Sequence, residues 1–212
     1  MKELRKDLLL YGVTDRRWLQ GNTLYEQVEE ALQGGVTFIQ LREKNRTKEE
    51  ILQEAKALKS LCGRYHVPLL INDDVEIALL SGADGVHVGQ NDMEAGEARK
   101  KLGPDKIIGV SARTVEQAIN AEKQGADYLG VGSVFSTGTK ADAQKIDRQT
   151  LKEICAAVHI PVIAIGGINR DNVTSLSGTG ICGVAVVSAI FAQRDIQEAV
   201  KDLKQLVKAT VE

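Results

Sequence analysis

The feature that most constrains this chain of 212 residues is a regular alternation between short apolar runs and longer amphipathic segments. Each run is rich in β-branched residues, ends in a polar or glycine-containing turn, and precedes a stretch with helical periodicity. The runs begin about every two dozen residues, the length of one strand and one helix. Strands are expected at residues 8–14, 36–41, 68–72, 84–88, 106–110, 127–131, 161–165 and 182–187. Eight such units predict an α/β fold, a single (β/α)8 TIM barrel that spans residues 1–212 as one domain.

Local signals at the helix ends support this count. Thr23, Thr47 and Thr114 are each followed three residues later by Glu or Gln, the spacing of a capping box. Glycine comes shortly before several strands, where a turn from helix to strand needs a positive φ. These glycines are Gly34, Gly35, Gly82, Gly103 and Gly125. An open doubly wound sheet has the same alternation, but no glycine-rich dinucleotide-binding motif follows the first strand, so we favour the barrel.

Composition excludes several classes of partner. A formal net charge of -2 and an aromatic content of 4% give neither attraction to polyanions nor stacking platforms, so nucleic acid and membrane are not expected partners. The charged start at residues 1–7 resembles no signal peptide or membrane span. Cys62, Cys155 and Cys182 lack the spacing of a metal site or a dithiol and are expected to be reduced core residues. These features predict a cytoplasmic protein with small-molecule ligands.

Polar residues able to bind phosphate or metal lie at the end of almost every predicted strand or just after it. They include Gln40 to Lys44, Asn72 and Asp73, Asp92, Ser111, Thr137 to Lys140, Gly166 and Gly167, and Ser188. In a barrel of parallel strands all these positions lie on one face, so residues far apart in the sequence surround one ligand. This pattern predicts an enzyme.

The second strand ends in a basic segment. Gln40, Arg42 and Lys44 point to one side by the period of two, whereas Ile39 and Leu41 point to the other. A planar guanidinium beside an ammonium suits a multiply charged anion. The alternative is a barrel interior in which these charges are paired and no ligand binds.

Two acidic segments follow the third and fourth strands. Asn72, Asp73 and Asp74 lie at the end of the third strand, and Asn91 and Asp92 follow the fourth. Oxygen ligands from neighbouring strands, completed by phosphate and water, are the usual way of holding Mg²⁺. The alternative is that these residues only cap the helices that follow.

Phosphate-binding features follow the last three strands. The segment from Ser133 to Ala143 is long for such a connection, and Thr137, Gly138, Thr139 and Lys140 offer hydroxyls, flexibility and a cation. Gly166, Gly167 and Ser188 follow the seventh and eighth strands, a recurrent phosphate site in this fold. We expect His87, late in the fourth strand, to be a hydrogen-bonded core residue.

Taken together, these segments resemble the thiamin phosphate synthase family over nearly the whole chain. The segments are residues 40–44, 71–73, 86–92, 109–111, 137–140, 164–168 and 186–190. The resemblance implies a TIM-barrel transferase of thiamine biosynthesis, with Mg²⁺, that joins hydroxymethylpyrimidine diphosphate to a thiazole phosphate. The products would be thiamin phosphate and diphosphate. We expect a dissociative substitution, because the electron-rich pyrimidine ring would delocalise the positive charge left on its methylene while Mg²⁺ and the basic residues stabilise the departing diphosphate.

The resemblance also implies a role for each matching residue. The pyrimidine diphosphate would be bound by Gln40, Leu41, Arg42, Glu43, Lys44, Asn72, Ser111 and Lys140. Of these, Arg42, Lys44, Ser111 and Lys140 would act catalytically on the leaving group, and Asp73 and Asp92 would hold the metal. The thiazole phosphate would be bound by Thr137, Gly138, Thr139, Gly167, Val187 and Ser188.

Two other functions fit the barrel. A related thiazole tautomerase shares the fold but uses a histidine in its site; Ala112 and Arg113 follow Ser111 here, and Asp73 and Lys140 are present, which favours the synthase. A regulatory barrel could sense thiamin phosphate without turnover. The sequence leaves open a homo-oligomer, and whether the thiazole substrate is the aromatic form or its carboxylated precursor.

Overall fold

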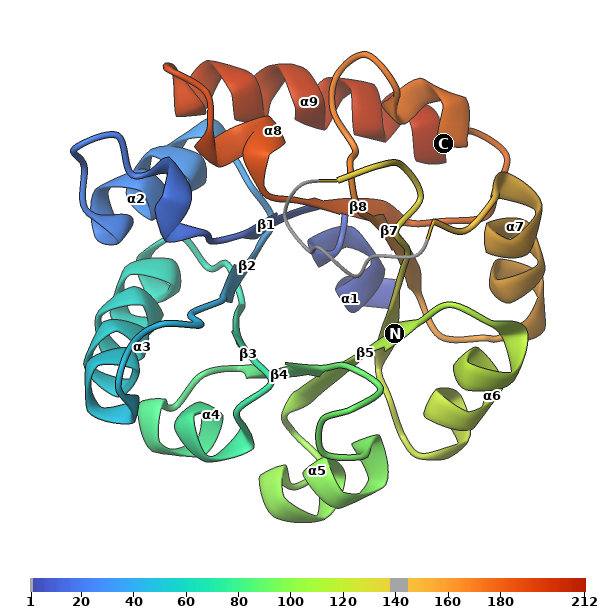
Figure 1. Cartoon of the computed structure of the whole chain (residues 1–212), viewed down its shortest axis with the longest axis horizontal. Coiled ribbons are helices and arrows are strands. Elements are labelled where there is room, and N and C mark those ends of the chain that lie inside the picture. The colour runs from blue at the N-terminus through green and yellow to red at the C-terminus, as the bar shows by residue number, and fades with distance from the viewer. Residues whose placement is uncertain (1, 138–144) are drawn as a thin grey trace.

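The computed structural model describes residues 2–137 and 145–212, and it confirms the predicted (β/α)8 barrel. Within these residues, parallel strands close in chain order, β1 pairing with both β2 and β8. The strands are β1 Leu10–Val13, β2 Phe38–Leu41, β3 Leu69–Asn72, β4 Gly85–Val88, β5 Ile107–Ala112, β6 Tyr128–Val131, β7 Val162–Ile165 and β8 Gly183–Val186. Each overlaps the range expected from the sequence. Figure 1, viewed along the barrel, shows the ring of strands with helices outside it.

Helices follow the strands as the amphipathic segments indicated. They are α2 Leu24–Gly34, α3 Lys48–Arg64, α4 Val75–Ser81, α5 Ala95–Leu102, α6 Val115–Lys123, α7 Arg148–Ala157, α8 Ser188–Phe191 and α9 Ile196–Val211. Between β7 and β8 the described helical segment is a short 3-10 helix, η2 Val173–Leu176, and another, η1 Arg16–Trp18, precedes α2. Thr23 and Thr47 form complete capping boxes. Thr114 accepts from the Gln117 N–H, but the Gln117 side chain accepts from Arg113 N instead.

The barrel has two apolar layers, because side chains alternate between the two faces of each strand. Ile39 and Leu41 of β2 belong to the outer layer, between the strands and the helices. Phe38 belongs to the inner layer within the barrel, with Tyr11 and Tyr128. The ring centroids of Tyr11 and Phe38 are 4.6 Å apart. A packed interior of this kind leaves only the strand ends for a ligand.

The amino end of the barrel is structural. Gly35, Gly82, Gly103 and Gly125 have the positive φ angles predicted for turns that enter strands, whereas Gly34 is the last residue of α2 and has none. A helix that the sequence did not predict, α1 Lys2–Asp7, lies within the ring of strands in Figure 1. Its Leu4 packs against the inner layer, next to Leu8. This charged helix therefore meets the barrel interior through one apolar side chain.

Candidate active site

The predicted site residues that the structure describes lie at the carboxyl ends of the strands. Gln40, Asn72 and Ser111 lie within the last two residues of β2, β3 and β5, respectively. Arg42, Lys44, Asp73, Asp92, Thr137, Gly167, Val187 and Ser188 come just after β2, β3, β4, β6, β7 and β8. Gly138, Thr139 and Lys140 lie outside the described residues. Because all strands are parallel, these segments share one rim of the barrel.

Asp73 and Asp92 form a pair of adjacent carboxylates on this rim. Asp73 has a φ of 65°, and its Oδ2 lies 2.6 Å from Lys44 Nζ. Asp92 Oδ2 accepts a hydrogen bond of 2.8 Å from the Gly89 N–H. Burial raises the pKa of the Asp92 carboxyl, and its hydrogen bond and charge interaction with Asp73 raise that pKa further, while Gly89 and Lys44 oppose the shift. A carboxylate whose ionisation is disfavoured by a neighbouring carboxylate marks a place for a cation.

Neither of these carboxylates caps a helix. Asp74 caps α4, because its side chain accepts from the Ile77 N–H at 2.9 Å. The N-cap of α5 is Glu94, whereas Asp92 lies in the loop before it. The capping alternative therefore explains Asp74 but not Asp73 or Asp92.

The two carboxylates fit Mg²⁺ better than a metal whose ligands all come from protein side chains. Within residues 2–137 and 145–212, no group of three or more His, Cys, Asp and Glu side chains could hold a metal. Mg²⁺ typically takes one or two carboxylates and completes its shell with substrate phosphate and water. Asp73 and Asp92 supply that number of carboxylates on the basic rim.

Arg42 presents an incompletely paired guanidinium to the rim. Its main-chain N–H donates to Thr14 Oγ1 at 3.0 Å, which fixes the backbone against the end of β1. Arg42 Nη1 lies 3.7 Å from Asp15 Oδ2, whereas Arg17 approaches the same oxygen at 2.7 Å. Arg42 Nε is buried and has no hydrogen-bond partner in the described structure. An unmet donor on a half-buried Arg argues against a fully paired interior and for an anionic ligand.

Leu41 and Glu43 point away from this basic side of the chain. The Leu41 side chain is buried in the outer layer. Glu43 is held by Arg16, with Arg16 Nε 2.9 Å from the carboxylate, and its side chain is 3% exposed. Burial raises the pKa of Glu43, although the Arg16 charge opposes this shift. A contact between either residue and a ligand in the barrel mouth would have to come from the main chain.

Ser111 is connected to Gln40 by a chain of buried hydrogen bonds across the barrel. Gln40 Nε2 donates to Tyr11 Oη at 2.7 Å, and Tyr11 Oη lies 3.0 Å from Tyr128 Oη. Tyr128 Oη lies 2.8 Å from His87 Nδ1, and His87 Nε2 lies 2.9 Å from Ser111 Oγ. The structure confirms that His87 is a hydrogen-bonded buried residue, but its contact with Ser111 was not predicted. The signal was available: His87 and Ser111 both alternate inward on adjacent strands.

The turn after β7 supports the segment that follows β6. Gly166 and Gly167 have φ angles of 101° and 67°. The Phe135 N–H donates to the Gly166 carbonyl at 3.0 Å, and a Cβ atom at Gly167 would lie 2.4 Å from the Ser136 carbonyl oxygen. Ser188 begins α8 and is exposed, and Val187 packs against the inner layer. This part of the rim offers main-chain groups at close quarters, as a phosphate site requires.

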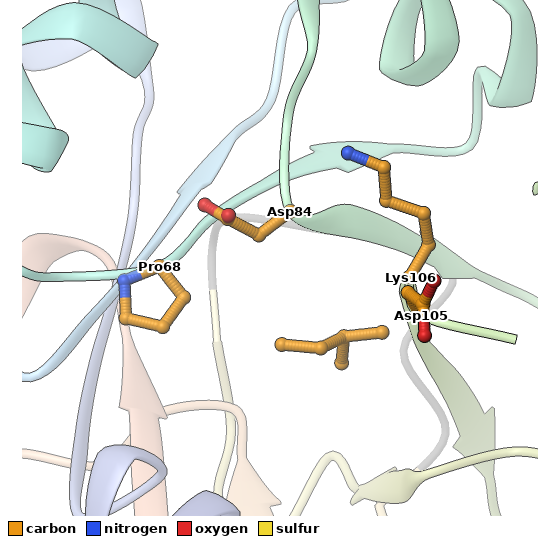
Figure 2. Close-up of a pocket in the computed structure, with 5 residues that line it drawn as sticks. Pro68, Asp84, Asp105 and Lys106 are labelled. Atoms are coloured by element: carbon orange, nitrogen blue, oxygen red, sulfur yellow. The ribbon is translucent and has the colours of Figure 1, made fainter.

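A depression at the other end of the barrel is built from structural groups (Figure 2). Its Asp84 carboxylate binds Lys59 Nζ at 2.6 Å and the Leu69 N–H at 2.8 Å. Lys106 Nζ donates to the Ala83 carbonyl at 2.6 Å. These groups tie helix and strand starts together at the amino end, where residues of this fold serve stability.

The fold and the rim together define a barrel enzyme with a charged site at the carboxyl ends of its strands. Residues 10–190 match the thiamine monophosphate synthase family. A thiamine-phosphate synthase from Ruminiclostridium cellulolyticum is 51% identical over 200 residues, which cover 94% of this chain and 95% of that protein. One from Clostridium tetani is 50% identical, covering 93% and 94%. The solved thiamine phosphate pyrophosphorylase from Pyrococcus furiosus has a TM-score of 0.91 and 42% identity, covering 99% of this chain and 100% of that one.

The chain belongs to the thiamine monophosphate synthase family, as the resemblance of its motifs indicated. It is thus a transferase of thiamine biosynthesis. None of the helices in the described residues has the length and apolar character needed to cross a membrane.

Proposed function

We propose that the chain, as one catalytic domain, joins hydroxymethylpyrimidine diphosphate to a thiazole phosphate with Mg²⁺, giving thiamin phosphate and diphosphate. The observation that carries this proposal is the cluster of Lys44, Asp73 and Asp92, beside the buried and unpartnered Nε of Arg42. A diphosphate needs several positive charges, and an acidic pair next to basic side chains allows a metal and cations to share it.

The pyrimidine diphosphate would lie over β2 to β5. Arg42 would donate two parallel hydrogen bonds to phosphate oxygens, and Lys44 would move from Asp73 to the ligand when a metal ion binds. Gln40, Asn72 and the Ser111 hydroxyl would orient the ligand from the strand ends. Lys140, which lies outside the described residues, is proposed as a further cation on the leaving group.

The thiazole phosphate would lie over β6 to β8. Gly167, Val187 and Ser188 would present main-chain N–H groups and a hydroxyl to the phosphate. Thr137 lies in the segment that packs against the Gly166–Gly167 turn, and Gly138 and Thr139 are proposed to complete the site. The two phosphates would thereby anchor the reactants on opposite parts of the rim.

The residues on this rim suit a dissociative substitution. The bond between the pyrimidine methylene and the diphosphate oxygen breaks, leaving a positive charge that the electron-rich ring delocalises. Arg42 and Lys44 stabilise the negative charge that grows on the leaving group, and Mg²⁺, when bound, adds to that stabilisation. The thiazole nitrogen then forms the new bond. Holding both reactants in line supplies much of the rate, and no side chain becomes covalently attached.

Diphosphate release from the two mixed substrates tests the function directly. With Mg²⁺, we expect release that needs both reactants and equals the thiamin phosphate formed. A thiazole tautomerase or a phosphate-sensing barrel would release none, and that result would overturn the proposal. Running the assay with the aromatic thiazole phosphate and with its carboxylated precursor identifies which of them is used.

Gly167→Ala is expected to raise KM for the thiazole phosphate about tenfold, because a side chain at positive φ costs about 1–2 kcal/mol and its Cβ displaces the Ser136 carbonyl. KM for the pyrimidine diphosphate should change little. Gly82→Ala is the matched control: Gly82 has a φ of 71° at the amino end, where an added Cβ meets nothing within 4 Å. Equal effects of both substitutions on KM would argue against a phosphate site at Gly167.

The cytoplasmic location stays a proposal that the cysteines support. Cys62, Cys155 and Cys182 are all free, and burial raises the pKa of the Cys62 thiol to about 12, which keeps it protonated and unreactive. Unpaired thiols of this kind suit a reducing compartment.

A further inference from the structure

We infer that His87 is a positioning residue, held as the neutral Nε2–H tautomer by Tyr128, so that the Ser111 hydroxyl is fixed as a hydrogen-bond donor to the ligand. This inference rests on the proposed role of Ser111 in binding the pyrimidine diphosphate. It concerns the direction of the hydrogen bonds in the buried chain from Gln40 to Ser111.

The direction of the chain is set at its Gln40 end. The Gln40 amide nitrogen donates to Tyr11 Oη, so the Tyr11 oxygen already accepts one hydrogen bond. Burial raises the pKa of both Tyr11 and Tyr128, so both hydroxyls keep their protons. Among the described residues, the other contact of the Tyr11 hydroxyl is Tyr128 Oη at 3.0 Å. A buried hydroxyl without an acceptor is costly, so Tyr11 donates to Tyr128.

Tyr128 and His87 extend this direction to Ser111. Tyr128 Oη accepts from Tyr11, and its own proton therefore goes to His87 Nδ1 at 2.8 Å. A neutral imidazole whose Nδ1 accepts must carry its proton on Nε2. His87 Nε2–H then donates to Ser111 Oγ at 2.9 Å. The serine oxygen is used as an acceptor, and its proton is left to donate to an anion.

The opposite direction leaves a group unsatisfied. If Ser111 donated to His87, then His87 would donate to Tyr128 and Tyr128 to Tyr11. Tyr11 Oη would accept from both Tyr128 and Gln40, and its own proton would have no acceptor in the described structure. That direction would also pair the Ser111 hydroxyl with a basic nitrogen, the arrangement of a nucleophilic serine, for which the proposed reaction has no use.

Glycines on two strands make room for this chain. A Cβ atom at Gly109 of β5 would lie 2.2 Å from Tyr128 Cζ, and one at Gly130 of β6 would lie 3.0 Å from His87 Cε1. Neither glycine has a positive φ, so the backbone conformation does not require glycine at either position. Both positions are therefore explained by the space that the two rings take up in the barrel.

The tautomer can be read directly by nitrogen NMR of histidine in the unliganded protein. Labelling with 15N-histidine gives three residues, His66, His87 and His159, and His159→Gln, at a side chain 93% exposed, helps to assign them. We expect His87 as the Nε2–H tautomer, with Nδ1 as acceptor. An Nδ1–H tautomer would overturn the inference. Because no substrate is present, this result is independent of whether the proposed function holds.

A double-mutant cycle tests whether the chain acts through Ser111. Tyr128→Phe should lower kcat/KM for diphosphate release about tenfold. This is the loss expected when the hydrogen bond from the Ser111 hydroxyl to the charged ligand is no longer held in place. In the Ser111→Ala background the same substitution should change kcat/KM less than twofold, because the two residues form one unit. An equal loss in both backgrounds would mean that Tyr128 serves only packing, and would overturn the inference. His159→Gln should leave kcat/KM unchanged, and the wild-type tautomer decides the matter if Tyr128→Phe fails to fold.

Discussion

Asp92→Asn is expected to lower kcat/KM for diphosphate release by about three orders of magnitude at limiting Mg²⁺, the equivalent of ~4 kcal/mol of transition-state stabilisation. The substitution keeps the size of the side chain and an oxygen that can accept from the Gly89 N–H. It removes one of the two charges that would hold the metal beside the diphosphate. The measurement is a Mg²⁺ titration of initial rates, in which the variant should need far more metal than the wild-type protein.

The matched control is Asp74→Asn, which removes a negative charge from the position next to Asp73 but retains a good N-cap for α4. It should keep a near-normal Mg²⁺ dependence. Equal losses in the two variants would indicate a general charge effect and contradict the assignment of Asp73 and Asp92 to the metal.

Thermal unfolding without Mg²⁺ separates this effect from misfolding. Burial and the neighbouring Asp73 raise the pKa of Asp92 in the folded state above its unfolded value. Ionisation of Asp92 therefore costs stability as the pH rises through the interval between these two values, and the cost persists at neutral pH. Since Asp92→Asn removes this cost, it should not lower the unfolding temperature. It should abolish the increase that Mg²⁺ produces in the wild-type protein.

Arg42→Lys is expected to lower kcat/KM for the pyrimidine diphosphate about a hundredfold, close to 3 kcal/mol, because an ammonium keeps the charge but cannot form two parallel hydrogen bonds. The buried, unpartnered Nε and the long contact with Asp15 leave the guanidinium available to a ligand. The loss should fall on the pyrimidine substrate, with KM for the thiazole phosphate nearly unchanged, when each substrate is varied in turn.

Arg17→Lys provides the control, since Arg17 binds the same Asp15 carboxylate from a more exposed position outside the predicted site. Burial alone would raise the pKa of Asp15, but hydrogen bonds from Arg17 and the charges of Arg17 and Arg42 lower it below its ordinary value. A hundredfold loss in Arg17→Lys as well would mean that Asp15, and not a direct phosphate contact of Arg42, accounts for the effect.

The barrel was predictable because its signals are local and repeated. Each strand is a short apolar run, and the capping residues at Thr23 and Thr47 mark the helix starts that follow. Such signals depend on residues within one or two turns of each other, so no knowledge of long-range contacts was needed. Local sequence does not tell whether Asp73, Asp74 and Asp92 cap a helix or bind a metal, because an aspartate suits both roles. Only the structure shows that Asp74 is the N-cap of α4 and that Glu94 is the N-cap of α5.

Features that depend on contacts across the barrel were not predictable. The helix α1 exists because Leu4 meets the inner layer of a barrel whose other residues lie far along the chain. The Glu43 side chain pairs with Arg16, which depends on how the segment after β1 passes the end of β2. The approach of His87 to Ser111 requires the register between β4 and β5 and the space given by Gly130. In each case the partner is remote in sequence.

The position of α1 has a practical consequence for handling this protein. Because the helix sits against the amino end of the barrel, a linker joined ahead of it leaves the molecule on the side away from the charged rim. Attachment to a solid support through that linker would leave the charged rim facing the bulk solution.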